Sequence, residues 1–272
     1  MSAATQSGLP GAEAPPETVP APTPPKPGHW HGVLESVQSM ATLIVIALFI
    51  ITFTFQPFRI PSESMIPTLL VGDFLLVNKE VSKDVSSGAF SKLIAPTYEI
   101  HRGDLIVFHY PVDPSMHLVK RAIGLPGDHV RLHNGKAWIN GQPLNEPYAI
   151  FRSAEPDSYR DEFPQLGSID PNVDSRWWIQ LRSLVNGGEI TVPADSFFVL
   201  GDNRNDSEDS RYWGFVPRAA IVGKPFMIYF SVRTPGETRA DAQLPQLPAE
   251  PHTRLGSVIA FARWDRAMSV IH

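Results

Sequence analysis

The sequence predicts a mainly β domain of antiparallel strands, preceded by one N-terminal apolar helix. Beyond residue 58 the apolar residues come in short runs separated by Gly, Pro, Asn and Asp, as is typical of strands joined by tight turns. Before that point, one apolar run is long enough for a helix that crosses a membrane. The chain has 272 residues, of which 43% are apolar, so it is long enough to bury a real core.

The overall composition excludes several classes of function. The net charge of −5, with no basic block, argues against a nucleic-acid partner. The absence of cysteine excludes disulfides, thiolate catalysis and cysteine-ligated zinc. The nine histidines show no metal-binding spacing, since His109 and His117 have no HExxH helix between them. We therefore expect no metal and no cofactor.

The first 36 residues are expected to form a flexible tail. Residues 1–28 hold eight of the 27 prolines and almost no large apolar side chains, so they have no need of a packed structure. No apolar region follows a basic start within the usual length, and the tail is therefore not a secretory signal peptide.

The strongest single segment is the apolar run SMATLIVIALFIITFTFQPF at residues 39–58. It carries no charge between Met40 and Phe55, where three threonines are the only polar residues. Twenty helical residues span about 30 Å, enough for a bilayer core. A buried core helix is the alternative, but the length and the lack of an amphipathic period favour a membrane span. We predict a transmembrane anchor over residues 37–58, and basic residues near its ends do not decide its orientation.

Residues 59–233 are predicted to form the β domain. The pairs Asn134-Gly135 and Asn140-Gly141 predict tight turns, because Asn and Gly supply the positive φ angles that short hairpins require. Strand-like apolar runs lie at 73–77, 105–110, 197–200 and 226–232.

Three further segments give weaker predictions. Residues 149–188 are polar with little periodicity, and we expect an insertion or an extended hairpin. The sequence indicates no role for it. A linker rich in Pro, Ala and acidic residues is expected at about 234–251. Residues 255–272 are predicted to form a short amphipathic helix that packs on the domain, with membrane contact as the alternative. Its apolar positions are Ile259, Phe261, Trp264 and Met268.

Ser64 is a candidate nucleophile. In the segment IPSESMIPTLLVGDFLLVNK, Pro61-Ser62 and Ile66-Pro67 bracket it, so it lies on a short restricted loop and not in a helix. A serine hydroxyl needs a base to become a good nucleophile. There is no GxSxG elbow and no histidine in a suggestive setting, which leaves a neutral lysine as the alternative base.

Lys120 is the candidate base. Only about one ordinary lysine in 2,500 is neutral at pH 7, and burial lowers the pKa by roughly 3 to 5 units. Lys120 follows the apolar pair Leu118-Val119. On a strand, alternation would place Lys120 and Leu118 on one face, in an apolar setting. The neighbouring cation Arg121 is expected to lower the lysine pKa further.

The polar segment GDNRNDSEDSRYWGFVP, at residues 201–217, is a candidate support for these residues. By composition alone it would be a surface turn. Asp209 and Arg211, however, have the spacing of an ion pair, and Trp213 would anchor the loop in the core. A rigid polar network of this kind commonly supports a catalytic residue.

Together with RGDLIVFHYPVDPSMHLVKRAIGLPGD at residues 102–128, these segments resemble the boxes of bacterial type I signal peptidase (leader peptidase), a family of Ser/Lys dyad serine proteases. The resemblance covers most of residues 37–130 and 195–232. The chain has Asn205-Asp206 where the family usually has Asp-Asn. The resemblance implies an antiparallel β catalytic domain on the outer face of the bacterial cytoplasmic membrane, a single span and a cytoplasmic tail.

The resemblance also implies roles for individual residues. Ser64 would be the nucleophile and Lys120 the general base, while the Ser62 hydroxyl and the Ser64 N–H would form the oxyanion hole. Ser207 would orient the lysine, supported by the ion pair of Asp209 and Arg211. The residues implied to contact substrate are Phe58, Ile60, Pro61, Met65, Leu69 and Val119.

The implied reaction is cleavage of secretory preproteins after small-x-small sites, the peptide adding as a strand beside shallow apolar pockets. Two alternatives remain open. One is a dedicated processing peptidase with a narrower substrate, such as a pilin. The other is a catalytically silent, membrane-anchored binding domain. A self-cleaving repressor is disfavoured, because no DNA-binding helix pair is present.

Overall fold

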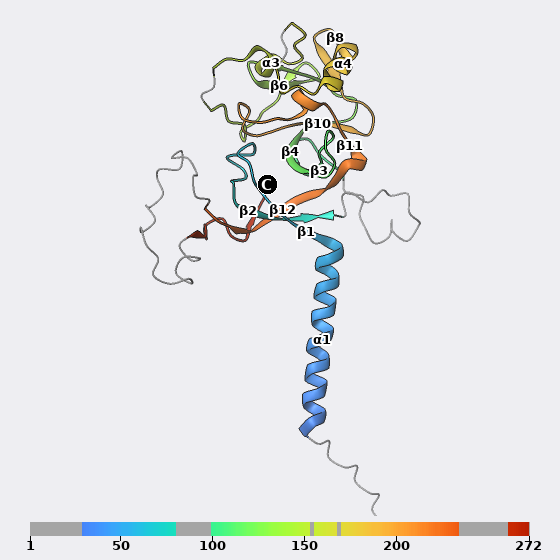
Figure 1. The fold of residues 1–272 in the computed structure, drawn as a ribbon, viewed down its shortest axis with the longest axis vertical. Helices are drawn as coiled ribbons and strands as arrows, with labels where there is room; N and C mark the ends of the chain where they lie inside the picture. The colour runs from blue at the N-terminus through green and yellow to red at the C-terminus, as the bar shows by residue number, and fades with distance from the viewer. Residues whose placement is uncertain (1–28, 80–98, 153–154, 168–169, 234–260, 272) are drawn as a thin grey trace, which may run out of the picture. The chain divides into compact units, whose positions relative to one another are not determined.

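The computed structural model describes residues 29–79, 99–152, 155–167, 170–233 and 261–271 (Figure 1). The chain divides into two compact units, residues 1–47 and 48–272. The predicted tail up to residue 28 and the predicted linker at 234–251 lie outside the described residues.

Helix α1 comprises His29–Thr54, 26 residues. It begins within the predicted tail and ends before residue 58, because Phe55–Arg59 leave the helix and form strand β1. Pro57 fits this outcome, since proline has no N–H to donate within a helix. Among the residues that the structure describes, no helix has the length and hydropathy that crossing a membrane requires.

The larger sheet is antiparallel and has eight strands. The path runs β1-β2-β12-β3-β4-β10-β11, and β13 pairs with β12 off this path. The strands beyond β1 are β2 (Asp73–Asn78), β3 (Leu105–His109), β4 (His117–Gly124), β10 (Ser196–Leu200), β11 (Val216–Pro217), β12 (Ile221–Ser231) and β13 (Ser269–Val270).

A second, five-stranded sheet has the order β7-β6-β5-β9-β8. Both predicted tight turns lie in it and are confirmed. Asn134 and Gly135 have φ angles of 51° and 72°, and Asn140 and Gly141 have 52° and 77°. The strands are β5 (His129–His133), β6 (Lys136–Ile139), β7 (Gln142–Pro143), β8 (Val185–Asn186) and β9 (Glu189–Thr191).

The structure confirms the four predicted strands. Three of them keep their predicted boundaries to within one residue, and the fourth begins earlier. Strand β12 begins at Ile221 and not at residue 226. Lys224 and Pro225 interrupt the apolar run that the sequence shows, but both are accommodated. The Lys224 amine pairs with Asp104 at 2.6 Å, and a register shift follows Pro225 in the pairing with β2.

Residues 149–188 are not an extended hairpin. Their described part, which omits 153–154 and 168–169, contains the helices α3 (Ser158–Asp161) and α4 (Ser175–Leu184), followed by the short strand β8. Trp177 and Leu181 are buried one helical turn apart on α4, and Tyr159, on α3, and Phe163, just after it, are buried as well. These few large apolar side chains, spaced within a polar sequence, join the core of the β domain.

The predicted C-terminal helix is wrong over residues 262–271. These residues form a bridge from Ala262 to Val232, a turn, and strand β13. The pairing with β12 satisfies the backbone that a helix would otherwise satisfy internally. Residues 255–260 lie outside the described residues.

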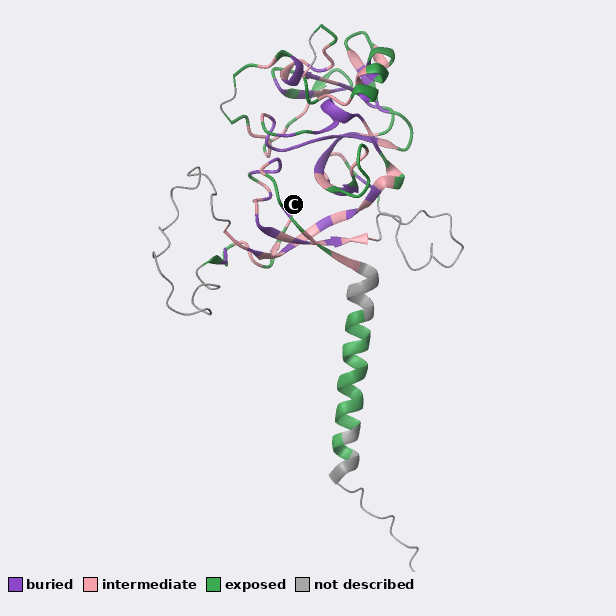
Figure 2. Ribbon diagram, viewed as in Figure 1, coloured by how far each residue is buried: buried purple, intermediate pink, exposed green. Residues whose placement is uncertain are grey.

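The core of the β domain is formed by buried apolar clusters that the strands contribute to. Figure 2 shows burial concentrated in the strands, whereas the described side chains of α1 are exposed. One buried apolar cluster lies under the loop that follows β1. It consists of Ile60, Met65, Leu69, Leu75, Leu105 and Ile228. The other short elements are α5 (Ser210–Trp213) and the 3-10 helix Arg218–Ala220.

Candidate active site

Ser64 lies on a turn-rich loop, as predicted. This loop, residues 60–72 between β1 and β2, is called the serine loop below. Backbone hydrogen bonds close the base of this loop, from the Ile60 N–H to the Asp73 carbonyl at 2.9 Å and from the Gly72 N–H to the Ile60 carbonyl at 2.9 Å. Met65 and Leu69 point into the core and are almost fully buried. The apolar anchor therefore fixes the loop from below while Ser64 remains slightly exposed, at 8%.

Lys120 lies in the middle of β4 and is 4% exposed. Burial lowers the pKa of Lys120 from 10.5 to about 8. The charge of Asp209 acts in the opposite direction, and that of Arg211 lowers the pKa further. The structure thus gives the lysine the apolar setting that strand alternation predicts.

Ser64 and Lys120 line one small cavity of about 50 Å³. Ser62 also lines it, and its hydroxyl oxygen lies 3.3 Å from the Ser64 Oγ. Leu69 does not line it, because it is fully buried in the core below. The predicted substrate residues that do line the cavity are Phe58, Ile60, Pro61, Met65 and Val119, and the lining also includes Arg59, His117 and Leu118.

One wall of this cavity is the first half of β4. Strand β10 pairs with β4 only at Arg121, Ala122 and Gly124, while β3 pairs with residues 117–121 on the other side. Among the described residues, no strand covers the free edge of His117–Lys120. This edge can therefore accept the backbone of an extended peptide.

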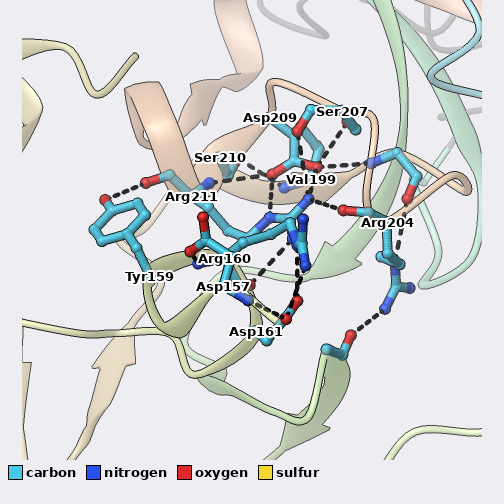
Figure 3. A network of polar contacts seen from close by, with 12 residues as sticks. Asp157, Tyr159, Arg160, Asp161, Val199, Arg204, Ser207, Asp209, Ser210 and Arg211 are labelled. Atoms are coloured by element: carbon cyan, nitrogen blue, oxygen red, sulfur yellow. Dashed lines mark hydrogen bonds and ion pairs between the residues drawn. The ribbon is translucent and has the colours of Figure 1, made fainter. Parts of the chain in front are cut away.

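The predicted ion pair of Asp209 and Arg211 is confirmed and fully buried (Figure 3). Arg211 donates from Nε and Nη2 to the two carboxylate oxygens, each at 2.8 Å. Burial alone would raise the pKa of Asp209, but the charge and hydrogen bonds of Arg211 outweigh it and hold the pKa below its ordinary value. The Ser207 hydroxyl donates to Asp209 at 2.8 Å, and among the described residues no hydrogen bond joins Ser207 to Lys120.

The polar segment also contacts the serine loop directly. The Asn203 N–H donates to the Ser64 carbonyl at 3.1 Å, and its side-chain amide donates to the Glu63 carbonyl at 3.3 Å. Gly201 lies where these parts meet. A Cβ there would lie 2.6 Å from the Ser64 carbonyl oxygen and closer still to the Ser207 hydroxyl, so the position needs a glycine.

Arg121 does not act on Lys120 in the way that the sequence predicts. It is buried and donates to both oxygens of Asp202, at 2.7 and 2.6 Å, and Thr68 also bonds this carboxylate at 2.5 Å. The cation that lowers the lysine pKa is Arg211 instead. Strand alternation gave a signal for this outcome, because neighbouring residues on a strand face opposite sides.

A second network, which the sequence does not predict, also holds the serine loop. Asp73 is fully buried and accepts a hydrogen bond from Arg266 at 2.6 Å and from Ser231 at 2.6 Å, while Arg263 lies 3.6 Å away. Arg266 also donates to the Thr68 carbonyl at 3.0 Å. The only available signal was the spacing of two arginines within a segment that was read as a helix.

Comparison with known proteins identifies the family. Residues 33–230 match the family model described as signal peptidase, peptidase S26. A signal peptidase I from Pseudomonas fluorescens is 37% identical over 216 residues, which is 73% of each chain. One from Leptolyngbya laminosa is 37% identical over 231 residues, covering 82% of this chain and 92% of the relative. One from Pseudomonas aeruginosa is 35% identical over 216 residues, again 73% of each chain. The match extends over most of the chain, and Ser64 and Lys120 line one cavity. The chain therefore belongs to the signal peptidase family, peptidase S26.

Proposed function

We propose that Ser64 and Lys120 are the catalytic dyad of this chain. As a member of the signal peptidase family, the chain is a serine endopeptidase that removes signal peptides from secretory preproteins. The observation that carries the dyad proposal is the meeting of Ser64 with a buried lysine at one cavity. With a pKa of about 8, roughly one Lys120 in ten is neutral at pH 7, against about one in 2,500 for an ordinary lysine.

The proposed reaction has two steps. Neutral Lys120 accepts the Ser64 proton as Oγ attacks the scissile carbonyl, and the resulting ammonium protonates the leaving amine. An ester on Ser64 remains. Lys120 then activates a water molecule that hydrolyses this ester and releases the signal peptide. Because the same amine accepts and returns each proton, no metal and no cofactor is required.

The oxyanion of each step needs donors that are already in place. The Ser62 hydroxyl lies 3.3 Å from the Ser64 Oγ, and the Ser64 N–H belongs to the same loop. A donor of this kind typically contributes about 3 to 4 kcal/mol to the transition state. The loop that carries both donors is held by the Asn203 contacts and the apolar anchor, which supports the assignment.

Ser207, Asp209 and Arg211 are proposed to position Lys120. Asp209 is close enough to oppose the lowering of the lysine pKa, and its own charge is balanced by Arg211. This pairing limits how far Asp209 stabilises the lysine ammonium. The Ser207 hydroxyl, which donates to Asp209, has a lone pair left to accept a hydrogen bond from the lysine.

The substrate is proposed to bind as an added strand along His117–Lys120. The cavity beside this edge is only about 50 Å³ and has an apolar lining from Phe58, Ile60, Pro61 and Val119. A cavity of this size favours small side chains, which supports cleavage after small-x-small sites.

We also propose that α1 anchors the chain in the bacterial cytoplasmic membrane, as a single span with the catalytic domain outside and the tail inside. The support is the uncharged sequence from Met40 to Phe55. Leu43, Ile44 and Val45 are consecutive exposed apolar residues, which successive 100° steps direct to different sides of the helix. A helix that exposes apolar side chains all round favours a lipid environment.

The test is cleavage of a model preprotein by detergent-purified protein. Wild type, Ser64→Ala and Lys120→Ala are compared, with Lys136→Ala as a matched control because Lys136 is exposed. We expect the wild type and Lys136→Ala to cut after a small-x-small site and the other two variants to be inert. Full activity of either dyad variant would overturn the assignment.

A further inference from the structure

The β3–β4 hairpin brings two histidines together at the rim of the cleft. His109 ends β3 and His117 begins β4, and the two are directly opposite in the register. Their ring centroids are 4.4 Å apart, with the rings tilted by 44°. His117 lines the catalytic cavity and also contacts the Phe58 ring, at a centroid distance of 5.3 Å. Eight residues apart in sequence, these rings are neighbours only because the chain turns back between them.

The tautomer of His109 is fixed by its hydrogen bond. Its Nδ1 lies 2.9 Å from the Pro114 carbonyl oxygen. A carbonyl only accepts, so Nδ1 must carry the proton, and in the neutral ring Nε2 then holds a lone pair. Histidines that bind metals almost always donate their other N–H to a carbonyl or carboxylate in this way.

Neither ring has a carboxylate partner of the kind seen at another exposed histidine. The His133 Nδ1 lies 2.7 Å from a carboxylate oxygen of Glu162. Among the described residues, neither His109 nor His117 forms an ion pair with a carboxylate.

We propose that His109 and His117 bind a divalent transition-metal ion, and that the bound ion closes the cleft to substrate. Imidazole nitrogens suit Zn²⁺, Ni²⁺ and Cu²⁺. With metal–nitrogen bonds of about 2.0–2.1 Å, two nitrogens that bind one ion lie roughly 3 Å apart. The two ring centroids are separated by 4.4 Å, so both rings lie within reach of a single ion. Water completes the coordination.

The site is inhibitory and not catalytic. The proposed site has two protein ligands, His109 and His117, and we therefore expect reversible binding. In the described ranges no group of three or more His, Cys, Asp or Glu could hold a metal ion. An ion with its waters at His117 occupies the start of the free β4 edge, where an extended peptide would have to lie. This blocking effect rests on the proposed function of the cleft, whereas metal binding itself does not.

The test measures binding and activity on the same untagged, detergent-purified full-length protein. Zn²⁺ and Ni²⁺ are titrated by calorimetry, and cleavage of a signal-peptide substrate is followed at each concentration. The test variant is His109→Ala, because His109 does not line the cavity and basal cleavage should be unchanged. Controls are His133→Ala and the double variant His29→Ala/His31→Ala, which removes the closely spaced pair before the apolar run.

In the wild type we expect one bound ion per chain, inhibition that parallels binding, and recovery on adding EDTA. Loss even of a ligand's hydrogen-bond partner typically costs roughly 10- to 100-fold in metal affinity. The His109→Ala variant should therefore bind at least about tenfold more weakly and resist inhibition by the same factor, while both controls behave as wild type.

Three outcomes would overturn the proposal. Equal inhibition of wild type and His109→Ala would place the metal elsewhere. Loss of metal binding only in the His29→Ala/His31→Ala variant would assign the metal site to His29 and His31. Binding without inhibition would refute closure of the cleft. None of these outcomes depends on which residue is the nucleophile, because metal-free cleavage is measured separately with the Ser64 and Lys120 variants.

Discussion

Lys120 shows how burial of one side chain changes its chemistry. The free energy of the charged ammonium rises when water is removed from it, so the neutral amine becomes accessible near neutral pH. Arg211 adds to this effect, while its pairing with Asp209 prevents that carboxylate from fully reversing it. The polar network behind the lysine therefore adjusts its basicity as well as its position.

The pH dependence of the reaction follows from this pKa. If neutral Lys120 is the base, kcat/KM should rise about tenfold per pH unit below pH 8 and level off above it, because the deprotonated fraction does so. The measurement is initial rates of peptide cleavage from pH 6 to 10. A flat profile through pH 8 would contradict the role of Lys120.

Replacement of Lys120 by arginine tests the same role without removing the charge. Arginine remains protonated at all accessible pH values and cannot accept the Ser64 proton. We expect Lys120→Arg to be as inactive as Lys120→Ala, at every pH tested, with far-UV circular dichroism confirming that both variants fold. Appreciable activity of the arginine variant would mean that the lysine acts only through its charge.

At the scale of elements, the serine loop is held by three separate parts of the chain. Strand β4 holds it through the Arg121 hydrogen bond to Thr68, the polar segment through Asn203, and the C-terminal segment through Arg266. These contacts converge on the loop that carries Ser62 and Ser64 and restrict its conformation. If the two serines are the oxyanion donors, as proposed, this restriction keeps them preorganised.

Gly201→Ala is expected to disturb this arrangement. The added methyl would press on the Ser64 carbonyl and the Ser207 hydroxyl, and overpacking of this kind typically costs about 1–3 kcal/mol. We expect a lower kcat with a modest fall in Tm, measured by steady-state kinetics and thermal unfolding. Gly167→Ala is the matched control, because its nearest atom is the flexible end of Gln165 at 3.3 Å. Unchanged kcat in Gly201→Ala would show that the loop tolerates displacement.

Local features were predictable from the sequence, and long-range ones were not. The Asn-Gly turns and the strand pattern around Lys120 depend on neighbouring residues, so periodicity and backbone preference were enough. The partners of Asp73, by contrast, come from the far end of the chain, and no local pattern marks them. The helices of residues 149–188 were missed because a few buried aromatic residues within a polar segment give little periodicity.

The Arg266–Asp73 contact gives a prediction for the C-terminal segment. Arg266→Ala removes charge-assisted hydrogen bonds to a fully buried carboxylate, and such bonds contribute about 1.5–3 kcal/mol each. A loss of about 2 kcal/mol would lower Tm by roughly 4–8 °C in a domain of this size. Because the same arginine holds the Thr68 carbonyl, kcat should fall more than KM rises. Arg176→Ala, at an exposed surface pair, is the control and should change neither quantity.

At the scale of the whole molecule, the chain joins a catalytic domain to an apolar helix. Residues 48–272 form a compact unit of their own, and strand β1 begins directly after the helix. If α1 lies in the bilayer, the tether confines the domain to the layer in which membrane-bound preproteins also lie. Confinement raises the effective concentration of the two partners without adding any contact between them.

Deletion of residues 1–54 separates this effect from catalysis, because it removes the helix and leaves β1 intact. Cleavage of a short soluble peptide should change little, since the cavity with Ser64 and Lys120 remains. Cleavage of a preprotein in lipid vesicles should fall by about 100-fold or more, because avidity of this kind contributes 10²–10⁴. Replacing residues 37–54 with an unrelated apolar run of equal length should restore vesicle activity, since a tether needs length and hydropathy and not a particular sequence. Equal loss on both substrates would instead mean that α1 contributes to the fold of the catalytic domain, and the anchor proposal would then lose its support.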